Sequence, residues 1–195
     1  MQQLELNHRD LEPNSIMYIG GLHPRKGLPD LLAAYELIYK KNVTPKLYIV
    51  GEGPYSKSYR DLAASLKSSE NIIFLGRTES PLSVLAFADV FVLPSHADPA
   101  PLVISEAREA RCAVIATRID GIPELLEEGE AGILVQAGNV TEIAQAIAML
   151  TNNKKNMEQW KLRSQINIDR LSVERVALQT IMVYNEVIGK GASDC

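Results

Sequence analysis

Two carboxylates and a glycine turn, all placed after short apolar runs, are the residues of this chain whose types and spacing suggest chemistry. Asp98 lies in the loop that follows the run 90–93, and Glu106 lies on the helix expected next, beginning near Pro101. Carboxylates accept hydrogen bonds from hydroxyl groups, often two from one diol, so sugar and ribose hydroxyls suit this pair. The residues alone are equally consistent with a carboxylate that opens a helix loop and another that faces water.

The segment GGLHPRKG, residues 20–27, offers a second kind of chemistry. Gly20 and Gly21 permit a close approach of the backbone to a ligand, and Arg25 and Lys26 directly precede an expected helix. A helix N-terminus with a basic residue is a natural phosphate site. A tight turn followed by an exposed basic pair explains the same residues, because short motifs often match by chance.

A third loop, LGRTES, follows another apolar run. The backbone groups of Gly76 and Arg77 there are suited to reading the edge of a nucleobase, although Arg77 is equally consistent with a solvated loop residue. His23 and His96 lie in loops but lack metal-ligand spacing with another histidine or cysteine. The sequence therefore predicts neither a metal site nor a bound cofactor.

Six short apolar runs must position these residues. Each run is nearly continuous rather than alternating, which is typical of strands covered on both faces of a parallel sheet. Apolar residues at helical spacing lie between the runs, and the pattern becomes purely helical after about residue 139. This order predicts an α/β fold, a Rossmann-like doubly wound parallel sheet whose ligands bind at the carboxyl ends of the strands. The runs are 16–20, 46–50, 71–75, 90–93, 113–117 and 132–135.

Composition limits the class of protein. The chain has 195 residues, enough for one sizeable domain, and 46% hydrophobic with 23% charged residues is typical of soluble globular proteins. A net charge of −4 argues against a nucleic-acid surface, and no run approaches the ~20 apolar residues of a membrane span. Two cysteines exclude a disulfide framework and fit a reducing compartment. We expect a polar lead-in at 1–14, a domain at 15–188 and a frayed tail at 189–195.

Taken in order, these segments resemble the C-terminal half of a GT-B fold, family 4 type retaining glycosyltransferase (glycosyl transferases group 1). The resemblance runs from about residue 16 to about residue 188, and the order of the motifs makes it specific. The motifs are IGGLHPRKGLPDLLAAY, YIVGEGP, NIIFLGR, ADVFVLPS, VIATRIDGIPELL and SVERVALQTIMVYNEVI.

The resemblance implies roles for the charged residues. Lys26 would bind the diphosphate of a nucleotide sugar, and Asp98 would lie near the hydroxyls of the donor sugar. Glu106 matches a glutamate that holds ribose hydroxyls. These three residues are the candidates for catalytic roles. The other donor contacts that the resemblance implies are Gly20, Gly21, Arg25, Gly76, Arg77, Ala100, Pro101, Leu102, Val103 and Gly121, several of them through backbone atoms.

The chain departs from the family pattern at several positions, including Arg111 and Ala113, which replace the usual Gly and Pro. Gly21 stands where many members have an arginine, and losing that charge-assisted contact would weaken donor binding by roughly 1.5–3 kcal/mol. Arg25 and Arg118 are candidate substitutes. Asp98 replaces a longer glutamate. Asp120 replaces the first glycine of a Gly-Gly turn, and its charge beside a diphosphate is unfavourable unless the side chain turns away.

The resemblance implies a metal-independent transfer of a hexose-type sugar to a hydroxyl acceptor, as in the synthesis of cell-envelope polysaccharides. Such an enzyme is cytoplasmic and reaches the membrane, where it does, through an N-terminal acceptor-binding domain that this chain lacks. The isolated chain is therefore expected to be inactive, and Val183, Tyr184 and Val187 on its last helix are expected to be exposed. Two alternatives share the fold: a divergent, non-catalytic binding module that serves a partner chain, and half of a nucleotide-sugar epimerase.

Overall fold

All six apolar runs form strands in the computed structural model, which describes residues 15–40 and 44–191. Every neighbouring pair runs parallel, in the order β3-β2-β1-β4-β5-β6, which confirms the predicted Rossmann-like sheet. The strands are β1 (Ile16–Ile19), β2 (Leu47–Val50), β3 (Ile72–Gly76), β4 (Val90–Leu93), β5 (Ala113–Thr117) and β6 (Ile133–Val135).

The strand order reverses direction between β1 and β4. Ile16 of β1 is in register with Leu47 of β2 on one side and with Val90 of β4 on the other. At such a switch point the helices that follow the two strands pack on opposite faces of the sheet, α1 (Leu28–Ile38) on one face and α4 (Leu102–Glu109) on the other, and ligands bind at the carboxyl ends between them. The loops after β1 and β4 therefore border the position where this fold binds ligands.

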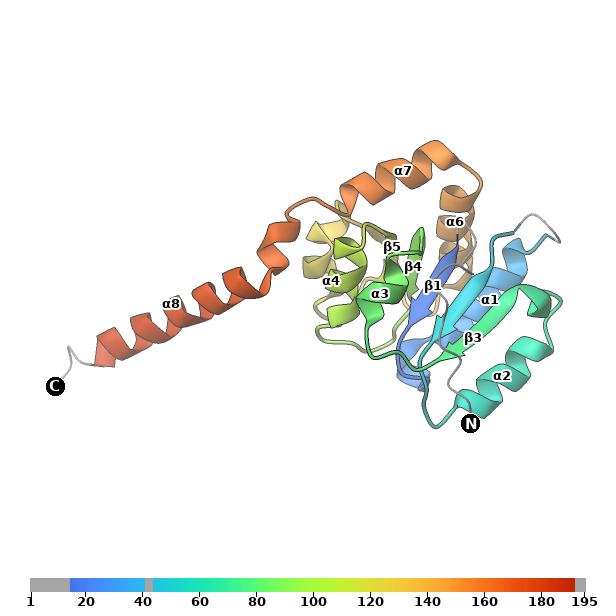
Figure 1. The fold of residues 1–195 in the computed structure, drawn as a ribbon, viewed down its shortest axis with the longest axis horizontal. Helices are drawn as coiled ribbons and strands as arrows, with labels where there is room; N and C mark the ends of the chain where they lie inside the picture. Colours follow the sequence, from blue (N-terminus) through green and yellow to red (C-terminus); the bar gives the residue numbers. More distant parts are fainter. Residues whose placement is uncertain (1–14, 41–43, 192–195) are drawn as a thin grey trace.

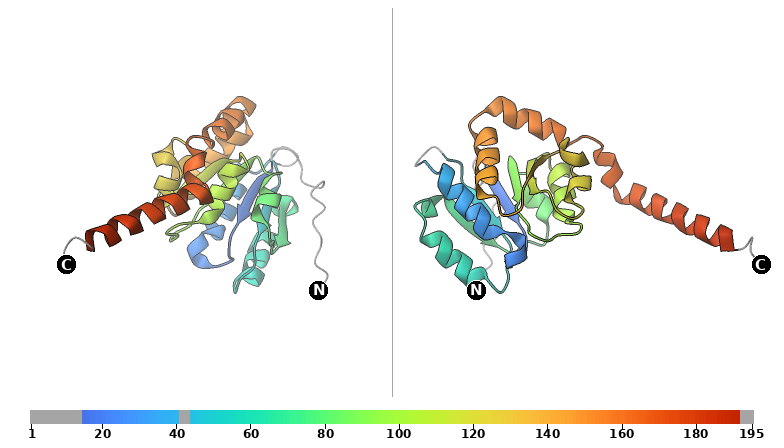
Figure 2. Two further views of the ribbon diagram at one scale, coloured as in Figure 1. Left: turned by 60° about the vertical axis from the view of Figure 1, so that its left-hand side comes forward. Right: turned by 180° about the vertical axis from the view of Figure 1, so that it is seen from behind.

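Helices cover both faces of the sheet (Figure 1). Helices α1, α2 and α6 pack on one face, α3, α4 and α5 pack on the other, and α7 crosses near the amino ends of the strands (Figure 2). The helices are α1 (Leu28–Ile38), α2 (Ser56–Ala64), α3 (Pro81–Leu85), α4 (Leu102–Glu109), α5 (Ile122–Leu125), α6 (Val140–Thr151), α7 (Lys154–Arg163) and α8 (Val173–Gly191), with short 3-10 turns η2 (Pro24–Lys26), η3 (Ser69–Asn71), η4 (Glu127–Gly129) and η5 (Ile168–Leu171).

The central strands contribute to both apolar layers. In β1, Ile16 and Tyr18 face the layer of α1 and α6, whereas Met17 and Ile19 face the layer of α3 and α4. Because successive strand residues point to opposite faces, burial on both faces requires the continuous apolar runs seen in the sequence. The double layer holds the carboxyl ends of the strands, and the loops that follow them, in fixed positions.

Helix α8 extends away from the rest of the protein (Figures 1 and 2). Val183, Tyr184 and Val187 are 60%, 64% and 64% exposed, as expected from the sequence. The helix continues to Gly191, past the boundary expected at residue 188, while the lead-in 1–14 and residues 192–195 lie outside the described residues. Within the described ranges, no helix combines the length and apolar character that crossing a membrane requires.

A fully buried arginine fixes the helix that carries Glu106. Arg108 of α4 donates hydrogen bonds to the backbone carbonyls of Leu125, Ser164 and Ile166. Two of these carbonyls lie at the ends of α5 and α7, where a helix leaves its last carbonyls unpaired and carries partial negative charge. The guanidinium thus fastens α4 to two other helices, and sequence pattern gave no sign of it.

Replacing Arg108 with methionine should lower the free energy of unfolding by about 3 kcal/mol, because three backbone carbonyls, all buried or partly buried, would lose this donor. Urea unfolding followed by circular dichroism would measure the loss. The surface variant Arg175→Met, which breaks an exposed ion pair with Asp169, is the control and should change stability by less than about 0.5 kcal/mol. Equal stabilities of the two variants would contradict the role of Arg108.

Candidate functional site

A buried ion pair joins the loops that follow β1 and β4. The Lys26 Nζ atom lies 2.5 Å from Oδ2 of Asp98, and the two side chains are only 14% and 8% exposed. Ser95 Oγ also donates to this carboxylate, at 3.3 Å. The sequence predicts both charged residues at this edge of the sheet. Their direct contact could not be predicted, because it joins residues 72 positions apart.

The same two loops are in tight backbone contact. A Cβ atom on Gly27, whose φ is +67°, would lie 1.8 Å from the carbonyl oxygen of Pro94, so only glycine fits there. The Arg25 carbonyl accepts a hydrogen bond from the His96 amide at 2.7 Å, and the Arg25 guanidinium donates one to the Ala97 carbonyl at 3.1 Å. Arg25, one candidate for the missing basic residue, is therefore fixed beside the Lys26 loop.

The other candidate for the missing basic residue, Arg118, has a different neighbour. Its guanidinium lies 3.9 Å from a carboxylate oxygen of Glu128, and both side chains are more than half exposed. Such a surface pair is weak, so it fixes the Arg118 side chain much less than the loop contacts fix Arg25.

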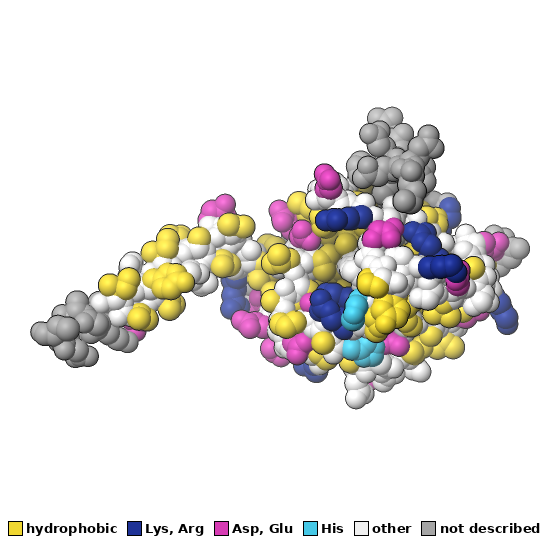
Figure 3. All heavy atoms as spheres, turned by 90° about the horizontal axis from the view of Figure 1, so that it is seen from below, with side chains coloured by type: hydrophobic (Ala, Val, Ile, Leu, Met, Phe, Trp, Pro, Cys, Tyr) yellow, Lys and Arg dark blue, Asp and Glu magenta, His cyan; other side chains and the backbone are white. Residues whose placement is uncertain are grey.

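Histidine and basic side chains gather beside apolar ones on the face at the carboxyl ends of the strands (Figure 3). His96 Nε2 lies 2.6 Å from Oδ2 of Asp30 and links the loop after β4 to α1. His23 packs edge-on against Tyr55, which stacks on Tyr59 with ring centroids 5.7 Å apart. Sequence reasoning missed Tyr55, although an exposed aromatic directly after the GEGP turn was a usable signal.

The turn after β5 is fastened to the loop that carries Asp98. Thr117 Oγ1 donates to the Ser95 carbonyl at 2.7 Å, and the Gly121 amide donates to the Pro99 carbonyl at 3.2 Å. A Cβ atom on Gly121 would lie 2.3 Å from that carbonyl oxygen, so this glycine permits the contact. Oδ2 of Asp120 accepts a hydrogen bond from the backbone amide of Asp98 at 2.7 Å. The carboxylate of Asp120 is thus directed at a backbone donor.

Glu106 lies on α4, which starts at Leu102 close to the position expected from the sequence. Its carboxylate is partly buried and makes no hydrogen bond or ion pair with the described residues. Burial raises the pKa of Glu106, and the nearby charge of Glu109 raises it further. The side chain is therefore an acceptor whose hydrogen-bonding capacity is unused.

The first turn of α4 contributes backbone donors. Pro101 is its N-cap and provides no side-chain cap, so the amides of Leu102 and Val103 have no partner within the helix. Ala100 is exposed, and the Leu102 side chain is 78% exposed. These residues lie between Asp98 and Glu106 and present backbone groups to the same edge.

Gly76 ends the outer strand β3, three strands from β4, and Arg77 directly follows it at the same edge of the sheet. At roughly 4.8 Å per strand, the distance across is about 14 Å. The Gly76 carbonyl already accepts a hydrogen bond from the Gly51 amide at 2.7 Å, and Arg77 is exposed. Only an elongated ligand could contact Arg77 and Asp98 together.

The glycines after β1 differ in the space around them. A Cβ atom on Gly20 would lie 3.0 Å from Oη of Tyr18, whereas a Cβ atom on Gly21 would meet nothing within 4 Å. Gly21 is exposed and has no positive φ. A larger side chain can therefore be placed at Gly21 without strain.

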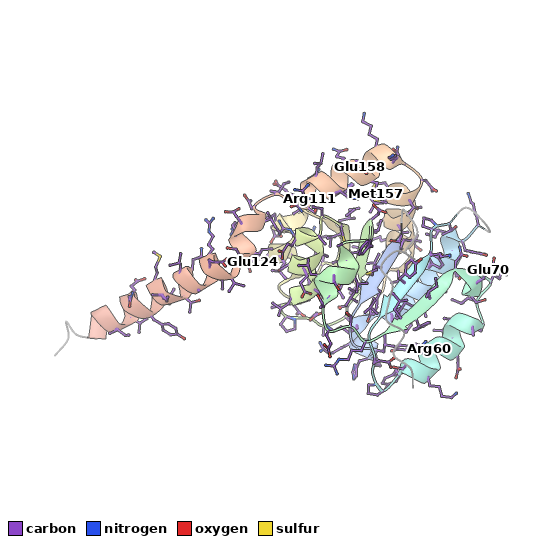
Figure 4. All side chains as sticks on the ribbon, viewed as in Figure 1. Arg60, Glu70, Arg111, Glu124, Met157 and Glu158 are labelled. Atoms are coloured by element: carbon purple, nitrogen blue, oxygen red, sulfur yellow. The ribbon has the colours of Figure 1, made fainter. Side chains whose placement is uncertain are left out.

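A hollow of about 630 Å³ lies elsewhere on the described surface. It opens at the amino ends of β4 and β5, where Phe87, Arg111, Lys161 and Leu162 are among its lining residues. Figure 4 shows Arg111 between α4 and α7, on the side opposite the η2 loop. Lys161 in this hollow is paired with Asp89 at 2.7 Å. This hollow is thus separate from the candidate site, which lies at the carboxyl ends of the strands.

Within residues 15–40 and 44–191, no three side chains of His, Cys, Asp or Glu are grouped so that they could hold a metal ion.

Comparison with known proteins identifies the family of the chain. The family model described as glycosyl transferases group 1 matches residues 3–166. The N-acetyl-alpha-D-glucosaminyl L-malate synthase of Bacillus anthracis is 27% identical over 190 residues, which cover 96% of this chain and 50% of that relative. The chain therefore spans about half the length of this curated relative.

Two solved structures share the fold. A TarM mutant of S. aureus, in complex with fondaparinux, alpha-GlcNAc-glycerol and UDP, matches with a TM-score of 0.79 and 22% identity, over 88% of this chain and 35% of that chain. The C-terminal domain of LpcC, a glycosyl transferase group 1 family protein from Francisella tularensis, matches with a TM-score of 0.71 and 23% identity, over 83% of this chain and 88% of that domain. The described sheet thus has the architecture of the C-terminal half of a GT-B fold.

Replacing Glu106 with glutamine should stabilise the protein at neutral pH. The raised pKa of Glu106 means that the unfolded chain ionises this group first, so the carboxylate lowers the free energy of unfolding as pH rises above about 4.5. The gain should therefore be present at pH 7 and absent at pH 4, as measured by urea unfolding at both values.

Glu109→Gln is the matched variant. It removes the neighbouring charge that contributes to the raised pKa of Glu106, so it should give part of the same gain. A Glu106→Gln gain of equal size at both pH values would contradict this account.

Proposed function

The chain belongs to the glycosyl transferases group 1 family, and we propose that it forms the donor-binding half of a retaining, metal-independent glycosyltransferase. The donor is a nucleotide diphosphate sugar, and the transferred group is a hexose-type sugar that passes to a hydroxyl acceptor. The observation that carries the proposal is the buried Lys26–Asp98 pair at the switch point, on the loop that leads into the helix of Glu106, whose carboxylate has no partner among the described residues.

Lys26 is the proposed partner of the donor diphosphate. Its ammonium has three donors, of which Asp98 receives one, so two remain for phosphate oxygens. Gly20 and Gly21 leave the backbone open to the phosphates, and Arg25 adds a second positive charge beside the loop. As the bond to the sugar breaks, the departing diphosphate gains negative charge, which this cation would stabilise electrostatically.

The carboxylates and backbone amides are the proposed partners of the remaining parts of the donor. Asp98 would accept hydrogen bonds from the hydroxyls of the donor sugar, and Glu106 from the ribose diol. Backbone groups from Ala100 to Val103, together with Gly121, would contact sugar and phosphate. The base would reach Gly76 and Arg77, a distance that suits an elongated nucleotide sugar.

The acceptor site belongs, in this proposal, to a further domain. The matched relative is about twice as long as this chain, and α8 exposes apolar side chains such as Val183, Tyr184 and Val187. A contiguous exposed apolar surface of this kind marks an interface. We propose that the other half of the enzyme covers α8 and that the isolated chain does not turn over substrate.

A non-catalytic binding module is the second candidate. Gly21 supplies no cation, and Asp120 places a negative charge on the turn beside the proposed diphosphate position. For this second candidate, both features are signs of lost donor affinity. The measured affinity for nucleotide diphosphates distinguishes the two candidates, because a module that has lost its donor site would bind none of them.

Titration calorimetry with UDP, GDP, ADP and their common sugar conjugates tests the proposal. One nucleotide should bind selectively, and Lys26→Ala and Glu106→Ala should each weaken that binding at least about tenfold, because each removes a charge-assisted hydrogen bond. Lys57→Ala, which removes an exposed lysine paired with Asp61 on α2, is the matched control and should bind normally. Failure of every nucleotide to bind would contradict the proposal for this chain.

Restoring a cation at position 21 should strengthen donor binding. Gly21→Arg places a guanidinium in open space at the loop that carries Lys26, and we expect about tenfold tighter binding of the selected nucleotide diphosphate. Gly21→Gln, which is uncharged and of similar length, controls for bulk. An arginine variant that binds no better than the glutamine variant would place the diphosphate elsewhere.

A further inference from the structure

Asp120 has a backbone conformation that few side chains tolerate. Its φ is +46°, in the left-handed region, which is unfavourable for residues other than glycine. Aspartate tolerates this region better than most residues, but it gains nothing there unless its side chain is used.

Among the described residues, the Asp120 carboxylate makes one hydrogen bond, to the residue proposed to bind the donor sugar. Its Oδ2 atom accepts a hydrogen bond from the Asp98 amide at 2.7 Å. A hydrogen bond to an ionised acceptor is about twice as strong as a neutral one. The side chain of the same Asp98 is held by Lys26 Nζ at 2.5 Å and by Ser95 Oγ at 3.3 Å. Both ends of Asp98 are therefore held, one by Asp120 and the other by Lys26.

Two further hydrogen bonds flank this contact. Thr117 fastens the Ser95 carbonyl before Asp98, and the Gly121 amide fastens the Pro99 carbonyl after it. Neither of them involves Asp98 itself. Without Asp120, the loop would still be attached at its two ends, while the amide of Asp98 would lose its acceptor.

We propose that Asp120 is a positioning residue that fixes the Asp98 carboxylate for recognition of the donor sugar. The inference rests on the proposed function, because it needs Asp98 to contact that sugar. The inference also explains why a negative charge lies beside the proposed diphosphate position. The Asp120 carboxylate holds Asp98, so it affects the affinity for the sugar more than the affinity for the nucleotide. The ratio of affinities for nucleotide sugar and bare nucleotide is therefore the quantity that depends on Asp120.

Three variants of the 195-residue chain separate the roles of this residue. Asp120→Asn keeps an oxygen acceptor and tolerates positive φ, whereas Asp120→Gly keeps the backbone conformation and removes the acceptor. Glu124→Gln removes an exposed carboxylate from the same turn region and is the charge control. Intact mass is checked throughout, because an Asn-Gly sequence deamidates back to aspartate.

The first measurement needs no ligand. Hydrogen exchange by NMR should show the Asp98 amide protected in the wild-type, Asn and Glu124→Gln proteins, and at least about tenfold less protected in Asp120→Gly. Equal protection in the wild-type and glycine proteins would overturn the proposed contact, whatever the chain binds.

The second measurement compares UDP with UDP-N-acetylglucosamine and GDP with GDP-mannose by calorimetry. Asp120→Gly should bind the bare nucleotide within about threefold of wild type while its preference for the sugar conjugate falls about tenfold, and Asp120→Asn should restore most of that preference. A uniform loss on both ligands would mean a merely structural role and would overturn the inference. Absence of binding by the wild-type chain would overturn the proposed function and, with it, the assignment of Asp120 to donor recognition.

Discussion

The close approach of the loops after β1 and β4 is the constraint on which the rest of the site depends. Gly27 lies against the carbonyl of Pro94 with no space for a Cβ atom, and the His96 amide donates to the Arg25 carbonyl. Neighbouring strands at the switch point bring these loops together, and the glycine allows them to touch. With the backbones in contact, Lys26 can reach Asp98 with its side chain, and a charged pair forms where the sheet ends.

The two carboxylates at the carboxyl ends of the strands, Asp98 and Glu106, have different electrostatic surroundings. Asp98 is satisfied by a lysine, a serine hydroxyl and, through its amide, a second aspartate, so its position is fixed. Glu106, on the neighbouring helix, is partly desolvated and has no partner among the described residues. A partly desolvated carboxylate lowers stability at neutral pH and is retained in proteins mainly where function uses it. The buried guanidinium of Arg108 offsets that loss by holding the same helix in place.

The sequence predicted the framework well because its signals are local. Continuous apolar runs identified all six strands, and glycines and charges after them identified the edge. What the sequence did not reveal depends on contacts between distant segments. Lys26 and Asp98 are 72 positions apart, and nothing near either residue indicates the pair. Arg108 lies in a helix segment where an arginine is normally exposed, so its burial becomes visible only when α5 and α7 are in place. In the sequence, Asp120 is recognisable only as a residue that replaces a glycine of the family's turn. Its role becomes visible in the structure, where its carboxylate contacts the Asp98 amide.

The strand order also has a consequence for the folding pathway. Strands β1, β2 and β3 form from the first part of the chain, while both carboxylates arrive with β4 and α4 from the second. The edge is completed only when β4 pairs with β1, a long-range closure that costs loop entropy and tends to come late. Until β4 pairs with β1, the glycine loop and Lys26 lack the partners that they have in the folded protein. A ligand that requires both halves of the edge would consequently slow the unfolding of the finished domain and leave its rate of folding unchanged.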